Sequence, residues 1–349
     1  MKKMMAQRLY GPRDLRWMET DIPELKENDM LIRVKYCGVC GTDQSIYSGE
    51  SSFWADGLIH TPMTFGHEYS GVVEAVGKNV TTFKPGDRVV SDTGISCGIC
   101  DFCREGNYLS CPQMKAVGTI NAQDGGYAEY TVMPERHVFH LPKNVSFEQG
   151  ALVEPVATGL YAVKVGRINI GENVLIIGTG PIGLGAVPFA ALSGARKVIL
   201  AGRRDFKLEL GAKFGADEII NTTKEDLYAR VMELTDGKGA DVIIEASGSV
   251  DMFHESVRMA NSCCRIAFVA FYEQPINDLN LDLMTIRGIQ LLPVMGSPNM
   301  GQVVIKMMES GKVDFTPMIT QVIPLHDAKK ALMDLKANSG ARIKILLEI

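Results

Sequence analysis

The sequence predicts an α/β protein in which a doubly wound parallel sheet is inserted near the C-terminal end of a β-rich domain. Up to about residue 150, short segments alternate apolar with polar side chains, as antiparallel strands do. Gly and Pro residues separate these segments. Beyond that point, continuous apolar runs alternate with helix-like segments, which is typical of a parallel sheet buried on both faces. Toward the end of the chain, apolar and polar residues are mixed again, and residues 343–347 form a strand-like segment.

We place the domain boundaries where the pattern of apolar and polar residues changes. With 349 residues, the chain is long enough for two domains of ordinary size. We expect a β-rich domain over residues 1–155, an inserted domain over residues 156–293 and a return to the first domain over residues 294–349.

The individual elements are predicted from their periodicity. In the first domain, alternation predicts strands at Met30–Tyr36, Gly71–Val76 and Asp87–Val90. In the inserted domain, continuous apolar runs predict four buried strands: Val174–Ile177, Lys197–Ala201, Asp241–Glu245 and Arg265–Val269. Helical spacing follows the second of these runs, over Arg204–Phe214.

One uncharged stretch, Val174–Ala195, is long enough to cross a membrane. Five glycines and two prolines interrupt it, so a strand, a glycine turn and a buried helix explain it better. The N-terminal residues lack the apolar core of a signal peptide. We therefore expect a soluble, cytoplasmic protein without membrane contact.

Composition and charge exclude several classes of protein. Apolar residues make up 46% and charged residues 22% of the chain, which argues against a disordered chain, a collagen or a coiled coil. Lys and Arg number 36 and Asp and Glu 41, for a formal net charge of −5. This acidic balance gives no electrostatic footprint for a nucleic-acid partner.

A glycine motif follows the first buried strand and opens a helix-like segment. It consists of Gly178, Thr179, Gly180, Pro181, Ile182 and Gly183. In this context, the glycines let the backbone approach a pyrophosphate, and the helix N-terminus supplies N–H donors. The motif therefore predicts a dinucleotide site, whereas a glycine turn used only for packing is the plainer alternative.

The end of the second buried strand bears on the choice of dinucleotide. NAD-binding proteins place an Asp or Glu there for the ribose hydroxyls, but this chain has Gly202, Arg203 and Arg204. A small residue leaves room, and two guanidinium groups suit a 2′-phosphate, so we expect NADP to be preferred to NAD. Two solvated arginines at a helix start are the alternative. Asp205, one residue further, is expected in the first turn of the helix.

Four cysteines lie within fifteen residues and predict a metal site. Their spacing, Cys97, Cys100, Cys103 and Cys111, suits one tetrahedral structural zinc in a lobe over residues 94–112. Iron–sulfur ligation is the competing interpretation. Thiols that bind metal belong in a reducing compartment. The remaining cysteines outside the candidate sites, Cys37, Cys263 and Cys264, are expected to be buried apolar residues.

A second candidate metal site is dispersed along the chain. Its members are Cys40, His67, Glu68 and Glu154. One thiolate, one imidazole and two carboxylates form the mix that binds a catalytic zinc with an open position. Beside a dinucleotide motif, such a site indicates a hydride-transfer enzyme.

Together these motifs resemble the zinc-dependent medium-chain dehydrogenase/reductase superfamily, which includes alcohol, sorbitol and threonine dehydrogenases. The resemblance covers essentially the whole chain. It rests on Gly-Val-Cys-Gly-Thr-Asp at 38–43, Gly-His-Glu at 66–68, the four-cysteine lobe, Val-Glu-Pro at 153–155 and the glycine motif. It implies a GroES-like catalytic domain and a Rossmann domain, with the active cleft between them, and a homo-oligomer, either dimer or tetramer.

The resemblance also implies roles for single residues. Cys40, His67 and a carboxylate hold the catalytic zinc, and either Glu68 or Glu154 is the direct ligand. Zinc lowers the pKa of the substrate hydroxyl, and hydride passes from the carbinol carbon to the nicotinamide. Thr42 matches a hydroxyl that relays the proton, and Asp43 orients His67. Lys207 matches a lysine near the adenine ribose.

The expected function is hydride transfer between a secondary alcohol, polyol or sugar-derived alcohol and NADP(H) or NAD(H). The Arg-Tyr pair with which sorbitol dehydrogenases contact the polyol is missing from residues 290–295, which argues against sorbitol itself. A threonine-type amino alcohol dehydrogenase or an aldehyde reductase is the alternative. A sensor that binds zinc and nucleotide without catalysis is disfavoured, because no ligand and no relay hydroxyl is missing.

Overall fold

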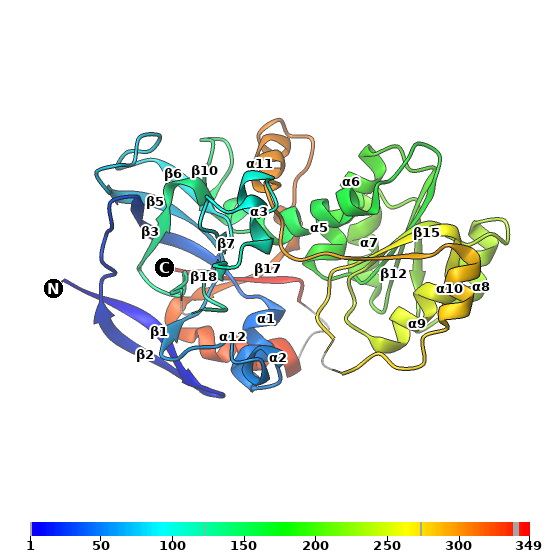
Figure 1. Ribbon diagram of the computed structural model, residues 1–349, viewed down its shortest axis with the longest axis horizontal. Helices are drawn as coiled ribbons and strands as arrows, with labels where there is room; N and C mark the ends of the chain where they lie inside the picture. Colours follow the sequence, from blue (N-terminus) through cyan, green and yellow to red (C-terminus); the bar gives the residue numbers. More distant parts are fainter. Residues whose placement is uncertain (1, 122, 273, 338–341) are drawn as a thin grey trace. The chain divides into compact units, whose positions relative to one another are not determined.

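The computed structural model describes residues 2–121, 123–272, 274–337 and 342–349 (Figure 1). Its chain divides into two compact units, residues 1–154 with 301–349, and residues 155–300. The second division lies seven residues beyond the 293/294 boundary expected from the sequence, because the segment after the last strand of the second unit stays with that unit.

The first unit is built on β-sheets. The largest has the strand order β10-β6-β5-β3-β18-β17, with β9 also paired to β3, and only β17 and β18 run parallel. These strands are β3 (Asp29–Gly38), β5 (Glu68–Val76), β6 (Arg88–Ser91), β9 (Tyr130–Pro134), β10 (Val138–His140), β17 (Ile319–Pro324) and β18 (Lys344–Glu348). A second sheet has the order β2-β1-β4, from β1 (Lys3–Gly11), β2 (Asp14–Asp21) and β4 (Met63–Thr64).

The core of this unit follows from the predicted alternation. Along β3, Met30, Ile32 and Val34 are buried while Arg33 between them is exposed, so one face of the strand enters the core. Leu347 of β18 packs in the same core. The last strand of the chain thus pairs with β3, the first strand of this sheet in the sequence.

Short helices connect these strands, and a small lobe projects from them. The helices are α1 (Gly41–Ser48), α2 (Ser52–Ala55), α3 (Asp101–Arg104), α4 (Phe147–Gly150), α11 (Gly301–Glu309) and α12 (Ala328–Ala337). The lobe contains the two-stranded pair β7 (Gly94–Ile95) and β8 (Lys115–Ala116), together with α3 and the 3-10 helix η1 (Tyr108–Ser110). Helix α5 (Val153–Gly166) runs from the end of the first unit into the second.

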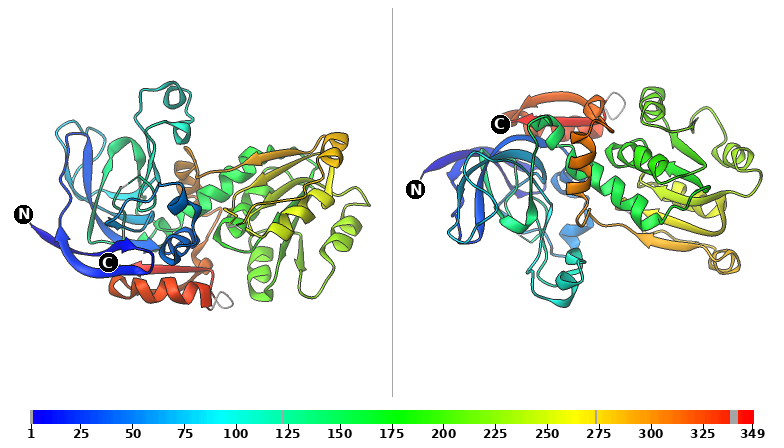
Figure 2. Two further views of the ribbon diagram at one scale, coloured as in Figure 1. Left: turned by 60° about the horizontal axis from the view of Figure 1, so that its bottom comes forward. Right: turned by 90° about the horizontal axis from the view of Figure 1, so that it is seen from above.

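The second unit is a parallel sheet with helices on both faces, as the sequence predicts (Figure 2). The strand order is β13-β12-β11-β14-β15-β16, from β11 (Asn173–Ile177), β12 (Lys197–Gly202), β13 (Glu218–Asn221), β14 (Ala240–Glu245), β15 (Ala260–Phe268) and β16 (Gln290–Pro293). Its helices are α6 (Pro181–Leu192), α7 (Asp205–Lys213), α8 (Leu227–Leu234), α9 (Val250–Met259) and α10 (Leu281–Arg287). The order reverses beside β11, at the point where doubly wound sheets bind ligands.

Both faces of the parallel sheet are covered. Leu175 and Ile199 pack in one cluster with residues of α8, α9 and α10. Ile176 and Leu200, on the opposite face, are also fully buried. The uncharged stretch 174–195 thus becomes β11, a turn and α6. Among the described residues, the structure contains no helix of the length and apolarity needed to span a membrane.

One expectation about the cysteines is wrong. Cys37 and Cys264 are buried, but Cys263 is exposed. Its backbone is left-handed, with φ of 61°, where the pairing of β14 with β15 shifts register. The irregularity turns the Cys263 side chain outward, which strand periodicity alone does not indicate.

Candidate active site and cysteine lobe

Three of the dispersed residues converge in the first unit. Cys40 precedes α1 as its N-cap residue, His67 immediately precedes β5, and Glu68 begins that strand. Their ligand atoms all lie within 4.8 Å of one another. Because β3 and β5 are paired, the segment that leaves β3 toward Cys40 lies beside the segment that enters β5. The pairing thus assembles a thiol, an imidazole and a carboxylate from distant positions.

The Asp43 carboxylate contacts two of the three residues, Cys40 and His67. Its side chain is fully buried, and one carboxylate oxygen accepts hydrogen bonds from Cys40 N at 3.1 Å and from the Tyr127 hydroxyl at 3.0 Å. The other oxygen lies 3.4 Å from His67 Nδ1. Burial opposes the charge of His67, but the Asp43 carboxylate and the Cys40 sulfur raise the pKa of His67 well above its usual value. The field in the cluster therefore favours a cation, which fits the expected zinc.

Glu68 has a partner that the sequence motifs do not predict. Lys344 Nζ lies 2.7 and 2.6 Å from the two carboxylate oxygens of Glu68, and 3.1 Å from the Val39 carbonyl oxygen. Both side chains are almost completely buried. Burial lowers the pKa of Lys344, but the Glu68 charge outweighs it, so the pKa is raised. The only signal in the sequence was a lysine within the apolar run 343–347.

A glycine makes room for this ion pair. A Cβ atom at Gly38 would lie 2.0 Å from Glu68 Oε2. Gly38 ends β3, the strand between β5 and β18, so the Glu68 carboxylate passes over it. A side chain at this glycine would therefore have to displace the carboxylate that pairs with Lys344.

Glu154 lies outside the group of three. It is in the first turn of α5, and its Oε1 accepts a hydrogen bond from the Thr93 hydroxyl at 3.1 Å. Asp92 in turn accepts hydrogen bonds from Thr93 N at 2.7 Å and from the Tyr108 hydroxyl. Burial raises the pKa of Asp92 to about 6. These contacts connect the cysteine lobe with Glu154, and neither Asp92 nor Tyr108 was predicted.

Thr42 is placed by the same turn as Cys40. It is half-buried in the first turn of α1, two residues beyond Cys40. Gly49 ends this short helix in a left-handed conformation with φ of 82°. Both ends of the segment that carries Thr42 are therefore well defined.

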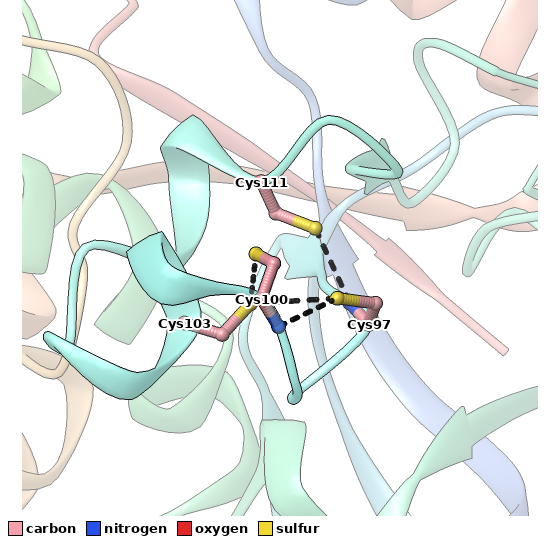
Figure 3. A group of neighbouring side chains, drawn as sticks. All are labelled: Cys97, Cys100, Cys103 and Cys111. Atoms are coloured by element: carbon pink, nitrogen blue, oxygen red, sulfur yellow. Dashed lines mark hydrogen bonds between the residues drawn. The ribbon is translucent and has the colours of Figure 1, made fainter.

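The four cysteines of the lobe come together around one point (Figure 3). All four sulfur atoms lie within 4.8 Å of one another, with Cys100 Sγ 3.4 Å from Cys103 Sγ. Backbone N–H groups point at the sulfurs, for example Cys100 N to Cys97 Sγ at 3.4 Å. The N–H groups of Ile99 and Cys100 lower the pKa of Cys97 to about 6. Such thiolates are metal ligands, so the lobe fits the expected zinc.

The glycine motif forms the turn from β11 into α6. Gly178 has φ of 113°, and a Cβ atom there would lie 2.7 Å from the Ala246 carbonyl oxygen. Gly180 is the N-cap residue of α6 and Pro181 its first residue. A Cβ atom at Gly183 would lie 2.0 Å from the Gly178 carbonyl oxygen, so the helix packs directly on the turn. The N–H groups that begin α6 suit an anionic ligand.

Three cations gather at the end of β12. Gly202 ends the strand, Arg204 is the N-cap residue of α7, and Lys207 lies in that helix. Burial, with the charges of Arg204 and Arg203, lowers the pKa of Lys207 to about 8. The positive charges repel one another and so disfavour protonation of Lys207. A bound anion would relieve this repulsion. Asp205 is held by Asn221 Nδ2 and Lys224 Nζ, each at 2.7 Å.

Comparison with known proteins identifies both parts of the chain. Residues 26–143 match the family model of the alcohol dehydrogenase GroES-like domain, and residues 181–310 match that of the zinc-binding dehydrogenase. An L-threonine 3-dehydrogenase of Bacillus velezensis is 35% identical, with 89% of each chain covered. A D-arabitol-phosphate dehydrogenase of Enterococcus avium is 32% identical, over 99% of this chain and 97% of its own.

The fold is also found among solved structures. A candidate zinc-binding dehydrogenase of Sinorhizobium meliloti 1021, crystallised with NADP, has 29% sequence identity and a TM-score of 0.90, with both chains covered completely.

Proposed function

Since the chain belongs to the zinc-dependent medium-chain dehydrogenase/reductase superfamily, we propose that it uses NADP(H) to interconvert a secondary alcohol of the polyol type and its carbonyl compound. That it is a zinc-dependent dehydrogenase using NAD(P) follows from the family. The observation that carries the choice of NADP(H) is the cationic cluster of Arg203, Arg204 and Lys207 at the end of β12. The polyol class is supported by relatives that act on sugar alcohols, such as the D-arabitol-phosphate dehydrogenase. NAD-binding chains place an acid there, and this chain offers three cations and no side chain at Gly202.

The contacts support the following proposed binding roles. Cys40, His67 and Glu68 would hold the catalytic zinc, with Asp43 orienting His67 through Nδ1. When bound, zinc supplies Lewis-acid polarisation of the substrate oxygen. Glu154, held by Thr93, is proposed to orient the group that occupies the open position. Thr42 is proposed to accept the substrate's hydroxyl proton and pass it toward the cofactor.

The four-cysteine lobe is proposed to hold a second, structural zinc. Its four sulfurs form a closed donor set, which leaves no position for substrate. Reduced thiols of this kind persist in the cytoplasm, where we place the protein. We also propose that the chains associate as a homo-oligomer, a dimer or tetramer, which sedimentation of the purified protein would test.

The cofactor preference is tested by initial rates with both cofactors. We expect kcat/KM to be about ten- to a hundred-fold higher with NADP than with NAD, the scale of one or two charge-assisted hydrogen bonds. Arg203→Ala and Arg204→Ala should each lower the NADP value while leaving the NAD value nearly unchanged. Lys213→Ala, an exposed cation at the far end of α7, is the matched control. A higher kcat/KM with NAD in the unaltered protein would refute the NADP proposal.

The substrate class is tested with a panel of polyols, polyol phosphates, sugar-derived alcohols and amino alcohols, followed by absorbance of the reduced nicotinamide. Oxidation of polyols or their phosphates supports the proposal. L-Threonine is the second candidate, because the Bacillus velezensis relative is an L-threonine 3-dehydrogenase. Turnover of threonine above all polyols would replace the first candidate by the second.

We expect two zinc ions per chain. Chelation should remove the catalytic zinc first, abolishing activity while the fold survives, because that site has fewer protein ligands. Cys100→Ser should instead remove the second zinc and lower the melting temperature, since metal binding there contributes to folding. Metal analysis by mass spectrometry measures both. At most one zinc in a fully active preparation would contradict this expectation.

A further inference from the structure

The Thr179 side chain fills the space in which any side chain at position 202 would begin. A Cβ atom placed on Gly202 would lie 2.5 Å from Thr179 Cγ2 and 2.9 Å from Thr179 Oγ1. The third-nearest atom, at 3.3 Å, is Thr179 Cβ. Thus a single residue, between the first two glycines of the motif, closes the end of β12 to anything larger than glycine.

Neither backbone is free to move away. The Gly202 carbonyl oxygen accepts hydrogen bonds from Thr222 N at 2.8 Å and Thr222 Oγ1 at 3.3 Å. On the other side, Gly178 N donates to the Ala201 carbonyl oxygen at 2.9 Å, which ties the glycine turn to β12. Opening a gap would break one of these hydrogen bonds.

The Thr179 side chain also has little freedom of its own. It is only 9% exposed, and its branch at Cβ restricts it to few rotamers. The conflict at position 202 involves both the methyl and the hydroxyl group, so rotation about χ1 exchanges one clash for another. The side chain must therefore be shortened, rather than turned, before position 202 can carry a side chain.

We propose that Thr179 is a specificity-determining residue: it excludes the ribose-binding carboxylate from position 202 and thereby holds the chain to NADP(H). The inference rests on the proposed NADP function and deepens it. It makes Thr179 and Gly202 one unit, so substitution of Gly202 and Arg203 alone cannot convert the chain to NAD. Thr179 must be reduced in the same variant.

Four full-length variants test this. They are Thr179→Ala, Gly202→Asp/Arg203→Ala, that pair with Thr179→Ala, and that pair with Thr179→Val. NAD and NADP dissociation constants are measured by fluorescence titration, and melting temperatures by calorimetry. Val keeps the branched shape of Thr without its hydroxyl group. The Val variant therefore distinguishes the steric effect of the side chain at position 179 from the effect of hydrogen bonds made by the hydroxyl group.

We expect Gly202→Asp/Arg203→Ala to lose NADP affinity without gaining NAD affinity. Adding Thr179→Ala should tighten NAD binding by roughly ten- to a hundred-fold, because the carboxylate that Gly202→Asp introduces can then accept hydrogen bonds from the ribose hydroxyl groups. Adding Thr179→Val should not. Equal NAD affinity in the pair, the Ala triple and the Val triple would overturn the proposal.

A second comparison keeps the steric claim testable if the aspartate variants do not fold. Gly202→Ala should lower the melting temperature, and Thr179→Ala/Gly202→Ala should recover most of that loss, because only the 3.3 Å contact with Cβ remains. Absence of this recovery refutes exclusion by Thr179. Preference of the unaltered protein for NAD would instead refute the cofactor proposal, so the two failures are distinguishable.

Discussion

Lys344→Met is expected to lower the free energy of unfolding by about 3–5 kcal/mol, the cost of leaving a buried charge without its partner. Lys344 Nζ contacts both oxygens of Glu68, and both side chains are almost completely buried. Met fills the space of the lysine stem, so the loss reports on charge rather than on a cavity. Denaturant unfolding is measured on the chelator-treated variant and on the unaltered protein treated in the same way, because the zinc that Glu68 is proposed to hold would otherwise replace the lost partner.

Two controls separate the ion pair from general effects. Lys312→Met removes an exposed lysine of the same unit and should change stability little. Glu68→Gln/Lys344→Met removes both charges and should recover part of the loss, because no unpaired ion then remains. If Lys344→Met and Lys312→Met unfold at the same denaturant concentration, the pair contributes nothing to stability.

Thr42→Ala is expected to lower kcat by about 10²- to 10⁴-fold, the usual contribution of a positioned proton-transfer group. The affinity for the cofactor should change little, because the hydroxyl is proposed to act on the proton of the substrate. Thr42→Ser keeps the hydroxyl in the same turn of α1 and should retain most of the activity. Single-turnover kinetics and fluorescence titration measure the two effects separately.

Ser48→Ala is the matched control for Thr42. Ser48 is on the same helix, and its hydroxyl donates only to the Ser45 carbonyl oxygen at 3.1 Å among the contacts described for it. Its substitution removes a hydroxyl from α1 without touching the turn at Cys40. Unchanged kcat in Thr42→Ala, under conditions where chemistry limits the rate, would remove Thr42 from the mechanism.

Features that depend on residues close together in the sequence could be predicted from the sequence alone. The uncharged stretch 174–195 was predicted to be a strand, a turn and a helix, and it forms β11, the glycine turn and α6. The four lobe cysteines lie within fifteen residues, so the loop itself brings their sulfurs together. The fold class was predictable because continuous apolar runs and alternating segments bury different numbers of faces.

Only the tertiary structure decided which distant residues meet. Lys344 pairs with Glu68 across 276 positions, because β18 and β5 flank the same strand. Thr179 closes position 202 because β11 and β12 are neighbours, and Cys263 is exposed because its strand shifts register. Periodicity reports how much of each side chain is buried, not what it is buried against. Chain connectivity thus determined the glycine turn and the lobe, while strand pairing decided the charge balance of the candidate metal site and the space beside the glycine motif.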